Sequence, residues 1–153
     1  MKKILSCLLI LSILFTPPTI IMGSETSEHV EYEYFEDGSY MMSIISQNDI
    51  STFSTSTLTG SRTSTYYNAD NEPMWYIKVT GTFTYGNGTS SCTSSSIQAE
   101  SYNSAWKLSN KTASKSGNTA TASATAKQYF AFVPIKTIEK TVSLTCSSTG
   151  VLS

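Results

Sequence analysis

The chain contains few of the residues from which catalytic and metal-binding sites are usually built. Among its 153 residues there are one histidine and three cysteines. The histidine, His29, lies in an acidic stretch without a nucleophile motif beside it, which argues against a Ser–His–Asp or Cys–His arrangement. One histidine and widely separated cysteines do not supply the four ligands of a structural zinc site. Cys-x-x-Cys and glycine-rich phosphate-binding motifs are absent as well, so we predict no metal, no cofactor and no enzymatic activity.

Charged residues are also scarce, at 14% of the chain, and they are unevenly placed. Residues 24–61 contain seven acidic residues and no Lys or Arg, whereas the segment from Arg62 onward contains eight basic and four acidic residues. These basic residues are spread along the expected strands, so we predict no nucleic-acid binding. The paired carboxylates of a glycosidase would have to come from the four acidic residues, and surface positions explain all four equally well: Asp70, Glu72, Glu100 and Glu139.

Long apolar runs are missing except near the N-terminus. The run from Ile4 to Phe15 is interrupted only by two serines and one cysteine, and it follows a start that carries two lysines. A basic start and a short apolar core are typical of a secretory signal peptide. A retained membrane anchor is the alternative, but the run is shorter than the ~20 residues that a spanning helix needs. We therefore predict a leader over residues 1–23 and a secreted, extracellular protein.

The acidic segment that follows, residues 24–55, is predicted to be an N-terminal arm or linker. Its first part has few aliphatic residues, and we expect it to stay mobile up to about Asp37. Tyr40–Ile45 is the apolar part that would pack against the edge of the folded body. Because the arm is acidic and the body is basic, the alternative is a pro-segment that shields a basic surface.

The stretch from Trp75 to Cys92 gives the clearest structural signal. Large apolar residues alternate with polar ones over its first half, which is the period of a strand with one buried face. Gly86-Asn87-Gly88 then provides residues suited to the positive φ angles of a tight hairpin turn. A two-residue loop would place Phe83 opposite Cys92 with both side chains inward, whereas a three-residue loop would turn Cys92 outward. Cys92 and Ile97 differ in parity, which predicts a bulge or an early strand end.

The rest of the body is also typical of strands separated by turns. A first strand is predicted near Thr57–Tyr67 and a last one over Thr137–Cys146. Between them, Thr119–Ala126 alternates hydroxyl residues with alanines, and this stripe of small residues leaves room for Trp75 or Trp106 at inward positions. About six strands at hairpin spacing predict an all-β domain over residues 56–153, either an antiparallel β-sandwich or a small barrel.

Removal of the leader would take Cys7 with it and leave two cysteines, Cys92 and Cys146. An even pair of cysteines in an exported chain predicts one disulfide bond. The alternative is a pair of free, buried thiols.

The spacing of Cys92, Trp106 and Cys146 resembles the Cys–Trp–Cys framework of immunoglobulin domains. Leu144 stands where that family has a tyrosine, so an immunoglobulin-like topology is not favoured. The chain more closely resembles small secreted β-proteins of low-GC Gram-positive bacteria that have a Trp/Cys/Trp/Cys framework. The positions that carry this resemblance are Trp75, Val79, Gly81, Phe83, Tyr85, Cys92, Trp106, Leu144, Cys146, Gly150 and Ser153. The resemblance implies secretion and a β fold, and it transfers no functional residue.

These features leave two classes of function. The first is a secreted binding or surface-interaction module, whose exposed aromatic residues contact a glycan or a cell-surface protein. The candidate contact residues are Tyr66, Tyr67, Tyr76 and Tyr102. The alternative is a membrane-active or antagonistic protein, similar to a bacteriocin or toxin. The alternation of Thr119–Ala126 and the basic body favour this alternative, because membrane β-segments alternate in the same way. Membrane contact is expected only under the alternative.

Overall fold

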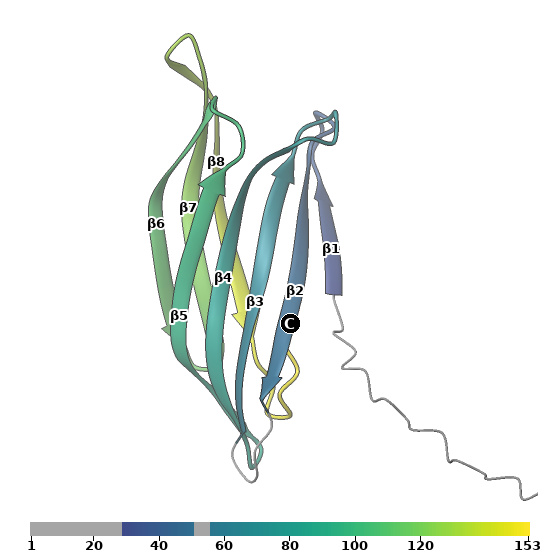
Figure 1. The fold of residues 1–153 in the computed structure, drawn as a ribbon, viewed down its shortest axis with the longest axis vertical. Coiled ribbons are helices and arrows are strands. Elements are labelled where there is room, and N and C mark those ends of the chain that lie inside the picture. Colours follow the sequence, from purple (N-terminus) through teal and green to yellow (C-terminus); the bar gives the residue numbers. More distant parts are fainter. Residues whose placement is uncertain (1–28, 51–55) are drawn as a thin grey trace, which may run out of the picture.

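The computed structural model describes residues 29–50 and 56–153, and every regular element in these residues is a β-strand (Figure 1). The predicted leader, residues 1–23, lies outside the described residues. The eight strands that the structure describes are β1 (His29–Tyr34), β2 (Tyr40–Ile50), β3 (Ser56–Tyr67), β4 (Pro73–Gly86), β5 (Thr89–Ser101), β6 (Trp106–Ser116), β7 (Thr119–Phe130) and β8 (Val133–Thr145). This part of the chain has no helix that is long and apolar enough to cross a membrane.

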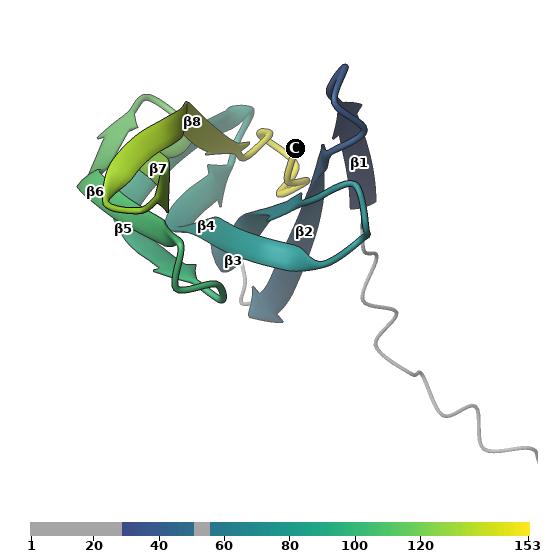
Figure 2. The same cartoon turned by 90° about the horizontal axis from the view of Figure 1, so that it is seen from above.

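The strands form two antiparallel sheets that enclose one core (Figure 2). One sheet has five strands in the order β1-β2-β3-β4-β5, and the other has three in the order β6-β7-β8. This arrangement confirms the predicted all-β sandwich, and the described strands do not close into a barrel. Each hydrogen-bonded neighbour is also the next strand in the chain. The topology is therefore an up-and-down meander and differs from the Greek key of immunoglobulin domains.

The first two strands lie within residues 24–55, where the sequence indicated an arm that is mobile up to Asp37. The structure differs, because β1 pairs with β2 along its whole length and β2 pairs with β3. The physical reason is the sequence of β1, His-Val-Glu-Tyr-Glu-Tyr, which alternates with the period of a strand. Residues 29–50 therefore belong to the five-stranded sheet, which is why the structure has eight strands instead of about six.

The β4–β5 hairpin has the predicted two-residue loop. Its loop residues, Asn87-Gly88, have φ angles of 52° and 78°. Phe83 lies opposite Cys92, and both side chains are buried. The register shifts at this point, which confirms the bulge that the parity of Cys92 and Ile97 predicted.

The core between the sheets depends on large side chains from β4 and small ones from β7. Trp75 and Trp106 are both buried, as predicted, and their ring centroids lie 5.9 Å apart. The alternating alanines of β7 also face this core: Ala120, Ala122, Ala124 and Ala126. They allow a close approach at Gly81 of β4, where an added Cβ atom would lie 2.9 Å from the Cβ of Ala120 and 2.5 Å from the Phe83 ring.

We therefore predict that Gly81→Ala destabilises the fold. The new methyl group cannot be accommodated unless the sheets or the Phe83 ring move, and overpacking of this kind costs about 1–3 kcal/mol. Unfolding in urea, followed by tryptophan fluorescence, measures the loss. Thr84→Ala on the opposite face of the same strand is the control, and equal stability of the wild type and Gly81→Ala would contradict the close contact.

The predicted disulfide between Cys92 and Cys146 is not formed in the structure, where both residues are buried free thiols. The thiol of Cys92 donates to the carbonyl of Ser94 at 3.2 Å, and the thiol of Cys146 donates to the carbonyl of Ser147 at 3.4 Å. The backbone amide of Cys92 donates to the carbonyl of Gly117, and that of Cys146 donates to the carbonyl of Asn118. The two cysteines are thus bonded to different residues of the β6–β7 turn. Burial raises the pKa of the Cys92 thiol, so it stays protonated and unreactive.

Thiol accessibility tests whether Cys92 and Cys146 are free and buried. In protein that lacks residues 1–23 and is kept without reductant, we expect slow alkylation of Cys92 and Cys146 under native conditions and rapid alkylation of both in denaturant. Intact mass measures the number of labels. Denatured protein that takes up label only after reduction would show that the two cysteines are bonded after all.

Candidate functional site

Three of the four tyrosines predicted as contact residues lie on the outer face of the five-stranded sheet. Tyr67 ends β3, Tyr76 lies on β4, and Tyr102 follows β5 and is 61% exposed. Tyr66 is instead a core residue. It is 3% exposed, and its ring packs 5.3 Å from that of Trp75. Adjacent residues of a strand point to opposite faces, so Tyr66 and Tyr67 cannot share one surface.

The outer face carries six tyrosines, which together form what we call the tyrosine surface: Tyr32, Tyr34, Tyr40, Tyr67, Tyr76 and Tyr102. The rings of Tyr40 and Tyr67 stack with their centroids 4.9 Å apart and their planes at 7°. Tyr34 lies 5.6 Å from Tyr40. Tyr76 stacks on Tyr102 at 5.5 Å.

The hydroxyl groups of Tyr67 and Tyr76 remain protonated at neutral pH, because the pKa of each is raised. Burial raises the pKa of Tyr67, and the neighbouring tyrosines, Tyr40 first, raise it further. Burial also raises the pKa of Tyr76, with smaller contributions from the Glu100 carboxylate and from Tyr102. A protonated phenol both donates and accepts hydrogen bonds, so these residues offer both polar roles beside an aromatic ring.

Half of the tyrosine surface was missed in the sequence because it lies in the segment expected to be an arm. Tyr32, Tyr34 and Tyr40 belong to β1 and β2, and register places Tyr34 opposite Tyr40 and Tyr40 opposite Tyr67. The alternation in β1 was the available signal. When this alternation is combined with the pairing of β1 with β2 and of β2 with β3, the three tyrosines lie on the same face as Tyr67.

Two ion pairs help to hold the strand that carries Tyr32 and Tyr34, one within its own sheet and one to the other sheet. β1 is an edge strand whose residues are all exposed, and its glutamates point inward while Tyr32 and Tyr34 point outward. Glu31 pairs with Arg62 of β3, and Glu33 accepts a hydrogen bond from Lys140 of β8 at 2.7 Å. The acidic N-terminal segment and the basic body thus meet within the fold. Exposed pairs of this kind each contribute only ~0–1 kcal/mol, so β1 is weakly held.

A second cross-sheet pair joins the β1–β2 turn to β8. Lys136 donates to the Asp37 carboxylate at 2.6 Å and to the Tyr66 hydroxyl at 2.7 Å. The hydrogen bond from Lys136, followed by those from Ser39, holds the pKa of Asp37 well below its usual 3.8. Burial alone would lower the pKa of Lys136, but its bonds to Asp37 and Tyr66 outweigh this and raise it.

The Asp37 pair predicts a pH dependence of stability. Because its folded pKa lies below the unfolded value of 3.8, Asp37 contributes stability above that value and loses the contribution as the pH falls toward the folded pKa. Asp37→Asn should therefore destabilise the fold at pH 7, and its effect should shrink as the pH drops from about 5 to about 2. Urea unfolding at several pH values measures this. Asp70→Asn, at a carboxylate without an ion pair among the described residues, is the control, and a pH-independent effect of Asp37→Asn would contradict the pair.

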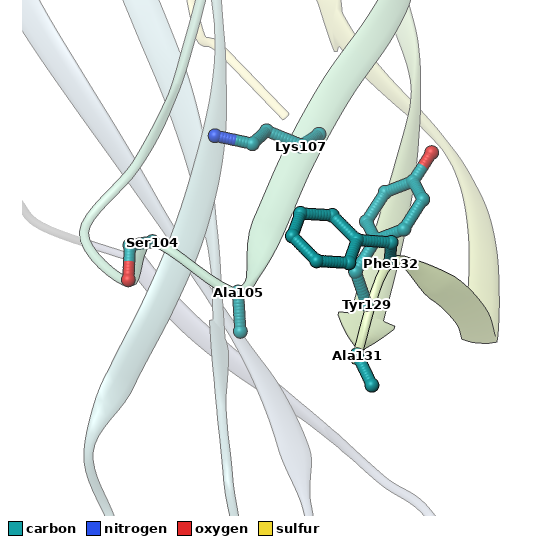
Figure 3. A pocket seen from close by; sticks show the side chains of 6 residues that line it. All are labelled: Ser104, Ala105, Lys107, Tyr129, Ala131 and Phe132. Atoms are coloured by element: carbon teal, nitrogen blue, oxygen red, sulfur yellow. The ribbon is translucent and has the colours of Figure 1, made fainter.

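A hollow with a largely apolar lining, which includes no residue of the tyrosine surface, lies at the tip of the β7–β8 hairpin (Figure 3). It has a volume of about 540 Å³ and is lined by Ser104, Ala105, Lys107, Tyr129, Ala131 and Phe132. Figure 3 shows the ring of Phe132 beside that of Tyr129. This lining lacks the carboxylates and imidazoles of a hydrolytic site and offers an apolar surface with one cation.

The carboxylates that the structure describes do not gather into a metal-binding cluster. No group of three or more His, Cys, Asp or Glu side chains within residues 29–50 and 56–153 could hold a metal ion. Glu72 accepts a hydrogen bond from the Asn68 side chain, whose oxygen in turn accepts from the backbone of Asp70 and Glu72. These contacts close the β3–β4 turn and are typical of an Asx turn.

Comparison with known proteins adds no relative: no family model, no curated protein and no solved structure matches the chain.

Proposed function

We propose that the mature chain is a secreted binding module whose tyrosine surface contacts a carbohydrate polymer of the cell surface. The observation that carries this proposal is the collection of six tyrosines from separate strands on one outer face. Solvent-exposed aromatic residues gathered in this way do not contribute to the core, and an exposed aromatic group that exceeds scattered single residues indicates an interaction site.

The chemistry of the tyrosine surface suits a sugar better than a purely apolar ligand. Its inner rings stack on one another and present edges and hydroxyl groups, whereas Tyr34 and Tyr102 are 72% and 61% exposed. These two rings provide apolar faces for the C–H groups of a sugar. The neighbouring phenols and the Glu100 carboxylate near Tyr76 provide partners for its hydroxyl groups. A row of such groups along neighbouring strands matches an extended polymer.

Retention on insoluble cell-wall polysaccharide tests this proposal. We expect the mature wild-type protein to be retained and the double variant Tyr34→Ser/Tyr102→Ser to bind roughly tenfold more weakly, because two exposed stacking rings are lost. Sedimentation of the polysaccharide followed by protein quantification measures the bound fraction.

The matched control is Phe132→Ser, which removes an exposed aromatic ring outside the tyrosine surface and should leave retention unchanged. Wild-type protein that stays in the supernatant, or a double variant that binds as tightly as the wild type, would sink the glycan proposal. Binding to intact cells that is lost after protease treatment of the cells would assign the ligand to a cell-surface protein instead.

The alternative function, a membrane-active protein, has lost one of its supporting observations. The alternation of Thr119–Ala126 is accounted for by the packing of the β7 alanines in the core. Membrane contact is favoured instead by a different element, the exposed tip of the β7–β8 hairpin.

A further inference from the structure

The β7–β8 hairpin ends in an apolar tip, which we define as residues 129–135. Its sequence, Tyr-Phe-Ala-Phe-Val-Pro-Ile, contains no charged residue. Phe132 at the turn is 98% exposed, and Phe130 is 73% exposed. Val133 and Ile135 are 60% and 58% exposed, so four large apolar side chains of one short segment face solvent. The turn projects beyond the neighbouring loops at its end of the molecule (Figure 1).

The backbone of the turn is unfavourable for the residues that occupy it. Ala131 and Phe132 form a two-residue loop with φ angles of 48° and 69°. Such loops favour Asn and Gly, and the chain uses Asn87-Gly88 in the equivalent β4–β5 turn. Elsewhere in the described residues, every residue with a positive φ angle is glycine or asparagine. The fold therefore gains no stability from a phenylalanine in this conformation with its ring exposed to solvent.

Cations lie directly behind the apolar tip. Lys107 of β6 lines the hollow next to Phe132 (Figure 3) and pairs across the strands with Lys127 of β7. Like charges placed opposite each other destabilise a sheet. Neither lysine forms an ion pair with a residue that the structure describes. The exposed carboxylate of that region, Glu139, pairs in register with Thr125, two residues further from the tip than Lys127. An anionic surface would compensate the two lysines.

We propose that the apolar tip inserts into the interfacial region of an anionic lipid bilayer. Phe130, Phe132 and Val133 would enter the boundary between headgroups and acyl chains, and Lys107 and Lys127 would face the anionic headgroups. A protein partner would need a cavity shaped for a projecting turn, whereas a bilayer accepts a convex apolar tip without one. Tyr129 at the base of the tip has the amphipathic ring that is enriched at membrane interfaces.

The hairpin is fixed well enough to act as an anchor. The backbone amide of Tyr129 donates to the carbonyl of Ala105 at 2.8 Å, which ties the end of β7 to the β5–β6 connection. β7 and β8 pair up to Phe130↔Val133, so only the two loop residues lie beyond the ladder. This anchoring is independent of the tyrosine surface, and either proposal can fail without the other.

Co-sedimentation with vesicles tests the proposal on the mature protein, purified from the medium of a host that exports it. One vesicle type is pure phosphatidylcholine and the other contains about one third phosphatidylglycerol, a composition whose negative surface potential attracts lysines. We expect the wild type to bind the anionic vesicles more tightly. Phe132→Gly should lower vesicle affinity by roughly 10- to 100-fold, because one phenyl ring no longer leaves water.

Phe132→Gly also separates binding from folding. Glycine adopts the positive φ angle without strain, so this variant should unfold at a higher temperature than the wild type while it binds vesicles more weakly. Lys107→Gln/Lys127→Gln should reduce binding to the anionic vesicles by roughly fivefold per lysine and leave binding to phosphatidylcholine unchanged. The matched control is Val151→Ser, which removes an exposed apolar side chain from the C-terminal segment and should leave affinity unaltered.

Three results would overturn the proposal. Wild-type protein that binds neither vesicle has no bilayer-inserting tip. Equal affinity of the wild type and Phe132→Gly would show that the tip does not enter the lipid. A concentration-dependent dimer in sedimentation velocity that Phe132→Gly abolishes would make a second copy of the chain the occupant of the tip.

Discussion

The close contact between β4 and β7 is the constraint on which the rest of the structure depends. β4 pairs with β3 and β5 in its own sheet, and it packs against β7 and β8 of the other sheet. Its large side chains fit because Gly81 and the alanines of β7 leave space between the sheets. Trp75 is fully buried in this arrangement and touches both Tyr66 and Trp106. The register of β4 therefore fixes which face of every paired strand is buried.

That register also creates the tyrosine surface. Because Trp75 points inward, its neighbour Tyr76 points outward. The pairing of the strands places the side chains of Tyr67 on β3 and Tyr40 on β2 on the same outer face. A bulge between Tyr66 and Tyr67 adjusts the end of β3 beside the β3–β4 turn. The aromatic rings thus gather at one end of the sheet without any loop designed to hold them. The proposed binding would use a face built on paired strands, so little ordering of the chain would be needed on contact with a ligand.

Sequence reasoning was most reliable where one physical rule dominated. Alternation with one buried face predicted the inward positions of Trp75 and Trp106, and the Asn87-Gly88 turn chemistry predicted the pairing of Phe83 with Cys92. The predicted disulfide was wrong, because an even number of cysteines does not show where the fold places them. In the structure, the backbone of each cysteine is hydrogen-bonded to a different residue of the β6–β7 turn. Sequence reasoning also placed the edge strand β1 in a mobile arm. Two of the charges that suggested an arm are paired with basic residues of β3 and β8, and these contacts depend on tertiary structure.

Two features of the chain depart from what the fold alone requires, and their physical effects differ. The inward glutamates of β1 follow a known strategy, since charges on an edge strand prevent association with other sheets while their ion pairs keep the strand in place. The Ala131-Phe132 turn has no such benefit. It combines an unfavourable backbone conformation with full exposure of an aromatic ring, in a chain that uses Asn-Gly for the same turn elsewhere. Because this turn costs stability and returns none, the β7–β8 tip motivates the proposed contact with a lipid bilayer.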